Sequence, residues 1–234
     1  MLGLTVGIGT ALVYAGYNCM APRSQLFGRT FIGNGPQSRD LSLTFDDGPN
    51  DPCTFRLLEI LSKYEIKATF FCIGRYVDQR PDIVREVIAQ GHVVANHTYT
   101  HPNLIFQSQR ETREELDRCN QALTNAVGDR HLKLFRPPFG ARRPATLRTI
   151  RKAGYEPIMW NVTAYDWRAK TADEIERNVY RQVRGGDVVL LHDGGHLEFG
   201  ADRSRTVEAT RRIIVRYREE GYTFVTVPRM MSAG

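Results

Sequence analysis

The chain has 234 residues, 41% of them hydrophobic and 25% charged, an ordinary balance for a globular protein with one substantial core. Its formal net charge of +6 favours anionic surroundings such as cell-wall polymers or anionic lipid. We expect no nucleic-acid partner, because no recognition motif and no basic stripe with interleaved aromatic residues accompanies the charge. The four cysteines are widely spaced without a Cys-x-x-Cys pair, which argues against a structural zinc site.

The amino-terminal segment is uncharged. Residues 1–22 carry no charged side chain, and their mostly apolar composition borders on a membrane span, so we interpret residues 2–20 as a membrane anchor. The first basic residues, Arg23 and Arg29, follow this stretch, which by the positive-inside tendency favours a cytoplasmic body. The alternatives are a signal anchor that lacks its basic start and a poorly packed extension. Of these interpretations we prefer the anchor for export. We therefore expect an exported, membrane-anchored or envelope-associated protein in which residues 1–38 form this segment and a linker.

Strand-like runs alternate with helix-like runs along the rest of the chain. Strands are predicted at 41–45, 68–73, 92–96, 132–135, 156–161, 187–191 and 223–227. Amphipathic helices are predicted between them, the longest at 108–127. About seven strands in alternation with helices are typical of a parallel sheet or barrel. Internal repeats and a second composition regime are absent, so residues 39–234 are predicted to form one α/β domain.

Two adjacent carboxylates, Asp46 and Asp47, end the first predicted strand. The run Leu41–Phe45 alternates apolar and polar residues, which indicates a half-buried strand, and Gly48-Pro49 stops it. Taken alone, this pattern favours a solvated turn, since Asp, Gly and Pro are common turn residues. Two adjacent acids are costly to bury unless a positive group lies beside them.

Further polar residues recur directly after predicted strands. In a parallel α/β barrel the carboxyl ends of all strands meet on one face, so residues distant in sequence converge there. The residues placed in this way are Asp46, Asp47, His97, His101, Arg136, Asp166 and His192.

His97 and His101 are four residues apart. On a helical turn, two imidazoles at this spacing project to the same side and can share one cation, although two surface histidines are the simpler interpretation. Together with Asp47 they offer two nitrogens and one oxygen to a divalent ion and leave a position open, as catalytic zinc sites do. Imidazole disfavours magnesium and calcium, whereas cobalt, nickel or manganese can compete with zinc.

Five segments resemble, in order and spacing, the motifs of the polysaccharide deacetylases, carbohydrate esterases with a NodB-homology domain. They are Thr44–Pro49, His97–His101, Arg136–Gly140, Asp166-Trp167 and Leu190–His192. The resemblance covers roughly residues 39–227. It implies a distorted (β/α) barrel with about seven parallel strands and metal-dependent removal of acetyl groups from N- or O-acetylated sugars.

The resemblance also implies a role for each acid and histidine of the first three motifs. Asp47, His97 and His101 match the metal ligands, with Zn²⁺ as the expected ion. Asp46 matches the general base that takes a proton from water, which gives the two adjacent acids separate tasks. Arg136 matches the arginine that holds this base in its charged form.

The remaining two motifs, together with Phe139 of the third, match the general acid and the substrate pocket. His192 matches the general acid, and Asp166 matches the carboxylate that orients it. The backbone N–H of Phe139 matches an oxyanion donor. Trp167 and Leu190 match residues that line the pocket for the acetyl methyl, although plain core packing also explains both.

The sequence therefore predicts a metal-dependent deacetylase of N-acetylated glycans. Peptidoglycan and chitin-like oligomers are the first candidate substrates, and acetylated xylan is the next. The alternatives are a metal-dependent hydrolase of other linear amides on the same fold and a glycan-binding module with an inactive site. We expect a monomer.

Overall fold

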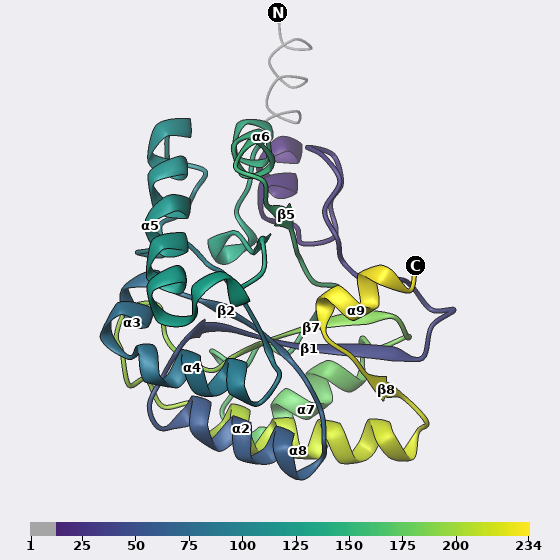
Figure 1. The fold of residues 1–234 in the computed structure, drawn as a ribbon. Helices are drawn as coiled ribbons and strands as arrows, with labels where there is room; N and C mark the ends of the chain where they lie inside the picture. The colour runs from purple at the N-terminus through teal and green to yellow at the C-terminus, as the bar shows by residue number, and fades with distance from the viewer. Residues whose placement is uncertain (1–12) are drawn as a thin grey trace, which may run out of the picture.

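The computed structural model describes residues 13–234. Its centre is a parallel sheet that curls into a distorted half-barrel, with seven strands in the order β5-β4-β3-β2-β1-β7-β6 (Figure 1). An eighth short strand, β8, pairs with the start of β1. The predicted distorted barrel with about seven parallel strands is confirmed. The strands are β1 (Asp40–Gly48), β2 (Thr69–Cys72), β3 (Val93–Asn96), β4 (Leu134–Phe135), β5 (Glu156–Pro157), β6 (Val162–Thr163), β7 (Asp187–His192) and β8 (Thr223–Phe224).

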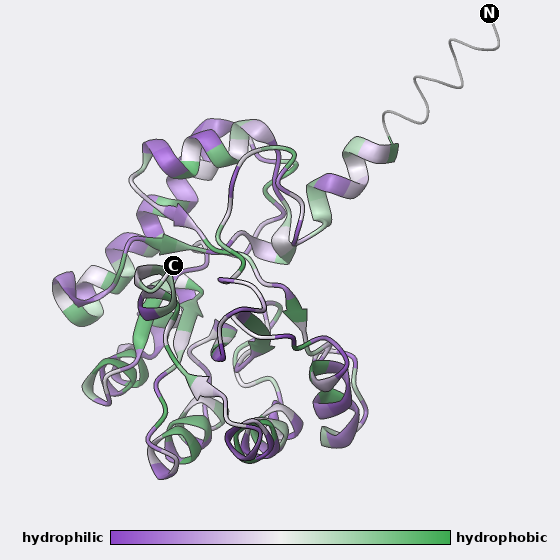
Figure 2. Cartoon of the chain, turned by 90° about the vertical axis from the view of Figure 1, so that its right-hand side faces the viewer, coloured by the Kyte–Doolittle hydropathy of each residue, from purple (hydrophilic) through white to green (hydrophobic). Residues whose placement is uncertain are grey.

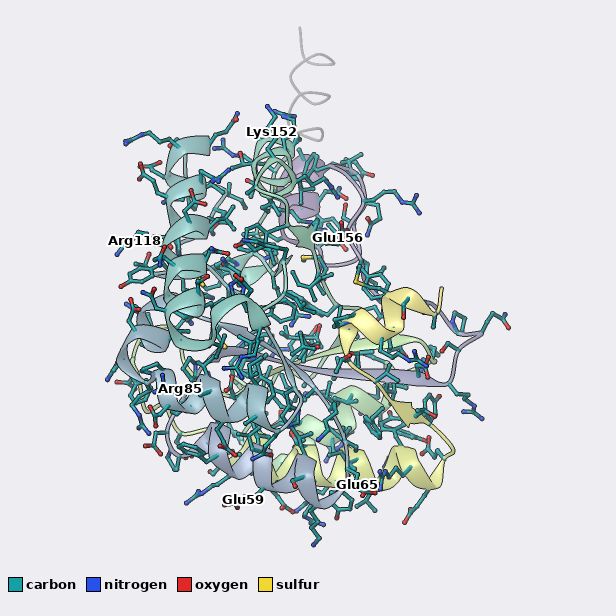
Figure 3. The ribbon with its side chains drawn as sticks, in the orientation of Figure 1. Glu59, Glu65, Arg85, Arg118, Lys152 and Glu156 are labelled. Atoms are coloured by element: carbon teal, nitrogen blue, oxygen red, sulfur yellow. The ribbon has the colours of Figure 1, made fainter. Side chains whose placement is uncertain are left out.

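Helices surround this sheet, and α2, α7 and α8 lie together along one side of β1 (Figure 1). Charged side chains such as Arg85 on α4 and Glu59 on α2 point away from the body (Figure 3), so part of the charge is spread over the outer helices. The helices are α2 (Cys53–Lys63), α3 (Gly74–Gln79), α4 (Pro81–Ala89), α5 (Gln109–Val127), α6 (Pro144–Lys152), α7 (Ala172–Tyr180), α8 (Ser204–Glu219) and α9 (Val227–Ser232).

Strand β1 is buried on both faces, so the prediction of a half-buried strand was wrong. Its apolar residues Leu41, Leu43 and Phe45 belong to the main core together with residues of α2 and α8. Thr44, on the opposite face, is also fully buried, and its hydroxyl accepts a hydrogen bond from Arg136 at 2.8 Å. The alternation therefore separates a helix-facing apolar core from a polar interior, rather than a core from solvent.

Leu43→Ala is expected to destabilise the protein by about 2–5 kcal/mol, because Leu43 is fully buried in the main core and its removal leaves a cavity. Urea unfolding followed by circular dichroism measures this loss. Leu132→Ala is the matched control, since Leu132 is 39% exposed and should cost much less. Equal losses in the two variants would contradict the placement of Leu43 in the core.

Three local features of the structure differ from what the sequence predicted. Of the strand expected at 156–161, only Glu156–Pro157 (β5) is strand, and β6 begins after it at Val162. Between the two, Met159 N–H donates to the Phe31 carbonyl and Asn161 N–H to the Val188 carbonyl. The short helices α3 and α9 were not predicted, since each follows a strand almost directly and spans only six residues.

The amino-terminal segment contains a helix at residues 13–20, which stands away from the domain (Figure 2). Its side chains Tyr14 and Tyr17 are more than half exposed. Most of the predicted anchor, residues 2–12, lies outside the described residues. Among residues 13–234, no helix combines the length and the apolar character that crossing a membrane requires.

Candidate active site

A cavity of about 490 Å³ lies at the carboxyl ends of the strands. Eight of the ten predicted site residues line it: Asp46, Asp47, His97, His101, Phe139, Trp167, Leu190 and His192. The other two, Arg136 and Asp166, are buried behind the cavity wall, where they bind Asp46 and His192. All ten predicted residues are thus brought together, although they come from segments up to about 150 residues apart in sequence.

Asp46 is bound to a fully buried arginine. The Nη1 of Arg136 donates to Asp46 Oδ1 at 2.7 Å and to the Thr44 hydroxyl at 2.8 Å. A second guanidinium nitrogen donates to the Met159 carbonyl, and the ring of Phe71 lies 4.1 Å below the cation. A buried carboxylate needs such a partner, and this one fixes Oδ1 while the second oxygen faces the cavity.

Asp47, His97 and His101 form a buried cluster in which one donor atom from each residue lies within 4.8 Å of the others. Asp47 Oδ1 is 3.5 Å from His97 Nε2 and 3.2 Å from His101 Nε2. Burial alone would raise the pKa of Asp47, but the surrounding histidines, His196 and His97 first, hold it well below its usual range. Burial lowers the pKa of His101 to about 2, so this imidazole is neutral at pH 7.

This cluster fits a divalent cation. His97 Nδ1 lies 2.7 Å from the Arg136 carbonyl, which only accepts hydrogen bonds, so Nδ1 carries a proton and Nε2 is the ring nitrogen that faces Asp47. Asp47 Oδ1 is buried and has no hydrogen-bond partner among residues 13–234. An ionised oxygen without a hydrogen-bond partner, next to the Nε2 atoms of two imidazoles, is the donor set of a metal with an open position.

The loop that carries the two histidines is not the helical turn that the spacing suggested. Thr98 and His101 have φ values of 68° and 65°, which no α-helix contains. The Asn96 side chain accepts from Thr98 N–H, and the Glu115 carboxylate accepts from Tyr99 and Thr100 N–H. These side-chain acceptors replace helical hydrogen bonds and still bring the two imidazole rings to 4.9 Å, centroid to centroid.

His192, the partner of Asp46 on the neighbouring strand β7, is held by a buried carboxylate. Its Nδ1 lies 2.8 Å from Asp166 Oδ1, and its backbone N–H donates to Asp166 Oδ2. The hydroxyl of Thr206 donates to the same Oδ2 at 2.9 Å. Burial alone would lower the pKa of His192, but the adjacent Asp166 outweighs it and raises the pKa to about 9. The imidazole is therefore a cation at neutral pH, and Nε2 is left for the cavity.

Apolar side chains complete the cavity. Leu190 is buried, whereas Trp167 and Phe139 are 47% and 44% exposed. The Trp167 ring lies edge-on to His192 with centroids 5.2 Å apart, and the Phe139 ring lies edge-on to His101 at 4.7 Å. Phe139 has a φ of 58°, a backbone conformation that L-residues rarely adopt.

Several cavity residues on the loop after β7 were not predicted from the sequence. His196 is one of them: its ring stacks on His101 at 4.7 Å, and its Nδ1 lies 3.8 Å from Asp47 Oδ2. Gly194 allows this path, since a Cβ there would lie 2.1 Å from the Asp47 carbonyl oxygen. Arg203, another residue that was not predicted, lines the cavity and donates to the Gly194 carbonyl.

Comparison with known proteins agrees with this geometry. The family model described as polysaccharide deacetylase matches residues 33–158. A chitooligosaccharide deacetylase of Sinorhizobium fredii is 35% identical over 206 residues, which cover 86% of this chain and 96% of the relative.

Solved structures share the fold. A peptidoglycan N-acetylglucosamine deacetylase is 33% identical with a TM-score of 0.78, and the match covers 86% of this chain and 91% of that one. A pseudoenzyme of family CE4 from Bacillus anthracis has the same TM-score at 28% identity, covering 86% and 68% of the two chains. With its buried Asp-His-His cluster and these relatives, the chain belongs to the polysaccharide deacetylase family of hydrolases.

Proposed function

We propose that this protein removes acetyl groups from N-acetylglucosamine units of chitin-like oligomers or peptidoglycan. The observation that carries the proposal is one cavity that holds the Asp47-His97-His101 cluster together with an arginine-bound carboxylate and a carboxylate-bound histidine. The substrate class is supported by the relatives, which are named as deacetylases of chitooligosaccharides and of peptidoglycan N-acetylglucosamine. Acetylated xylan is the next candidate.

The cluster of Asp47, His97 and His101 would hold one divalent ion, and we propose Zn²⁺, with Co²⁺, Ni²⁺ and Mn²⁺ as alternatives. Such an ion, when bound, supplies a Lewis acid for the acetyl carbonyl and lowers the pKa of a coordinated water.

Asp46 is the proposed general base. Its Oδ1 is fixed by Arg136, and its Oδ2 lies 3.7 Å from His97 Nε2, which places the free oxygen beside the ligand cluster. A carboxylate in this position can accept a proton from water, while Arg136 keeps the acceptor oriented and balances its charge throughout the reaction.

His192 is the proposed general acid. An amide nitrogen leaves only after it has gained a proton, and the Nε2 of a cationic His192 can donate one into the cavity. Asp166 fixes the ring through Nδ1, so the donating nitrogen is always the one that faces the substrate. The Phe139 N–H is the proposed oxyanion donor, and Leu190 with Trp167 would enclose the acetyl methyl.

Deacetylation should decline at alkaline pH as His192 loses its proton. The pKa of this imidazole is raised to about 9, above its unfolded value, so the cation and the stability from its pair with Asp166 are present below pH 6.5 and are lost as the pH rises through about 9. Asp166→Asn removes the opposite charge and should move the alkaline limb of kcat down by roughly 1–3 pH units. The pH dependence of acetate release from N-acetylglucosamine oligomers is measured for the wild-type protein and for Asp166→Asn. Alkaline limbs at the same pH in the two proteins would contradict the assignment of His192 as the general acid.

Acetate release from three glycans tests the function. The full chain, loaded with Zn²⁺, is incubated with N-acetylglucosamine oligomers, peptidoglycan and acetylxylan. We expect release from at least one of the two N-acetylated glycans. A metal-loaded protein that releases no acetate from any of them would refute the deacetylase. Oligomer binding without turnover would favour the inactive binding module, a relevant alternative because a pseudoenzyme shares the fold.

We also propose that the protein is exported and held at the cell envelope through residues 2–20. The support is the uncharged, mostly apolar sequence of residues 1–22 and the exposed side chains of Tyr14 and Tyr17 on helix 13–20. Protease treatment of intact cells tests the location: cleavage of the domain from outside supports export, whereas full protection of the domain until the cells are lysed would contradict it.

A further inference from the structure

The segment that the sequence suggested as a linker is bound along the domain. Residues 19–34, called here the amino-terminal strap, bridge the two sides of the curled sheet. Phe31 pairs with Ile158 next to β5, and Gly33 pairs with Asp187 at the start of β7. Phe31 also packs against a second apolar cluster, which includes Phe71 of β2 and Leu190 of β7. Backbone pairing of this kind belongs to the folded domain rather than to a flexible linker.

Arg142 holds the strap to the loop that carries Phe139. Its side chain is 1% exposed, and its guanidinium donates to main-chain oxygens only. Nη1 donates to the Gly140 carbonyl at 2.9 Å, and Nη2 donates to Ala21 at 2.8 Å and Ser24 at 2.7 Å. The backbone N–H of Arg142 donates to Cys19. A planar fork of donors can join two chain segments in this way, which a lysine ammonium cannot.

The strap also fixes the segment that carries Trp160, a residue of the cavity wall. Phe31 accepts a hydrogen bond from Met159 N–H at 2.8 Å, and Arg23 donates to the Asn161 carbonyl, so the residues on both sides of Trp160 are tied to the strap. Met159 in turn accepts from Arg136, the partner of Asp46.

The Phe139 loop and the Trp160 segment, which the strap holds, touch each other beside the cavity. Gly140 packs so closely on Trp160 that a Cβ at Gly140 would lie 2.8 Å from the indole ring. The strap therefore holds both residues of this contact. It is joined to Gly140 by Arg142, and it is hydrogen-bonded to Met159 and Asn161, the two neighbours of Trp160. Phe139, the residue before Gly140, has its backbone in the left-handed region, a conformation that persists only where the surroundings impose it.

We propose that the amino-terminal strap is part of the catalytic apparatus: latched by Arg142, it fixes the Phe139 loop and the Trp160 segment in the positions that turnover requires. The catalytic part of this inference rests on the proposed deacetylase function. Arg142 is a positioning residue, since its side chain binds the strap and Gly140 and does not line the cavity. A displacement of about 1 Å in a reacting group can cost roughly 100-fold in rate, so loosening this support should lower kcat more than it raises KM.

Two strap variants in the full chain test the inference. Arg142→Lys keeps the charge but loses the fork, and Arg23→Ala removes an exposed side chain whose loss should not unfold the protein. Arg148→Met on α6 is the control, because Arg148 is exposed on the same part of the fold. Each variant is measured for thermal unfolding, Zn²⁺ affinity, kcat and KM, and for hydrogen exchange at residues 138–141 and 158–161.

We expect Arg142→Lys, at a temperature where it is folded, to lose roughly tenfold in kcat and to exchange at least about tenfold faster in the two segments, with Zn²⁺ affinity nearly unchanged. Arg23→Ala should show the same effects more weakly, at 158–161 first. Folded variants with the kcat and exchange of the control would overturn the inference. If the wild-type chain releases no acetate, the proposed function fails, and unaltered exchange in the variants would still overturn the strap separately.

Discussion

Asp46→Asn is expected to lower deacetylation by about 10²–10⁴-fold while the protein still binds its metal ion. The amide has nearly the shape of the carboxylate and keeps an oxygen for Arg136 Nη1, but it cannot take a proton from water. The measurement pairs acetate release with the metal content of the purified variant after dialysis. Thermal unfolding reports whether the fold survives the loss of a buried charge.

Asp47→Asn is the matched control, since it makes the same chemical change one residue further along the chain. Asp47 Oδ1 faces both imidazoles, whereas Asp46 Oδ1 faces Arg136. Asp47→Asn should therefore lose metal as well as activity. The reverse outcome, with metal lost from Asp46→Asn and retained by Asp47→Asn, would mean that the two carboxylates exchange their proposed tasks.

His101→Ala is expected to weaken Zn²⁺ binding by roughly 100–1000-fold, which is the share of one ligand in the binding free energy of a typical protein zinc site. Within residues 13–234, three side chains contribute to the cluster, so two of these donors remain after the substitution. Competition with a fluorescent chelator measures the affinity, and activity should fall in parallel at limiting Zn²⁺. Removal of the ion from the wild-type protein by a chelator should abolish acetate release in the same way.

His196→Ala is the control for this prediction, because His196 stacks on His101 but lies outside the three-residue cluster. Its Nδ1 is 3.8 Å from Asp47 Oδ2, a distance at which it can influence the ligand without replacing it. We expect its removal to change Zn²⁺ affinity by less than about tenfold, in the range of residues that support a ligand. An unchanged affinity in His101→Ala, or a loss in His196→Ala as large as in His101→Ala, would contradict the assignment of ligands.

The fold could be predicted because its strongest signals are local. The alternation of β1 and the apolar spacing of helices such as α2 and α8 follow from which side chains must face the core. The N-cap of α7 could be anticipated in the same way, since threonine is a preferred N-cap residue. In the structure the Thr171 hydroxyl accepts a hydrogen bond from Glu174 N–H. The division between β5 and β6 was not visible, because it depends on hydrogen bonds to the strap, more than 120 residues away.

The ten site residues could be named because each lies at or just after the end of a strand, where motif and topology agree. The rest of the site depends on close approaches that no spacing encodes. The path of His196 is set by contact between Gly194 and the backbone of Asp47, and Thr206 reaches Asp166 from the start of α8. The true conformation of the His97–His101 loop likewise depends on Glu115, which comes from α5.

The cavity is divided between groups fixed in the interior and groups presented at its rim, and this division bears on how such an enzyme evolves. Asp46 and Asp47 belong to the central strand and are nearly inaccessible, so almost any replacement there disturbs the core as well as the chemistry. Phe139, Trp167 and Leu197 are between 44% and 84% exposed at the cavity mouth, and mutation can exchange them at little cost in stability. The buried residues can thus stay unchanged and keep the reaction, while mutations at the rim change which glycan is preferred. Directed evolution of substrate range should therefore begin at the rim.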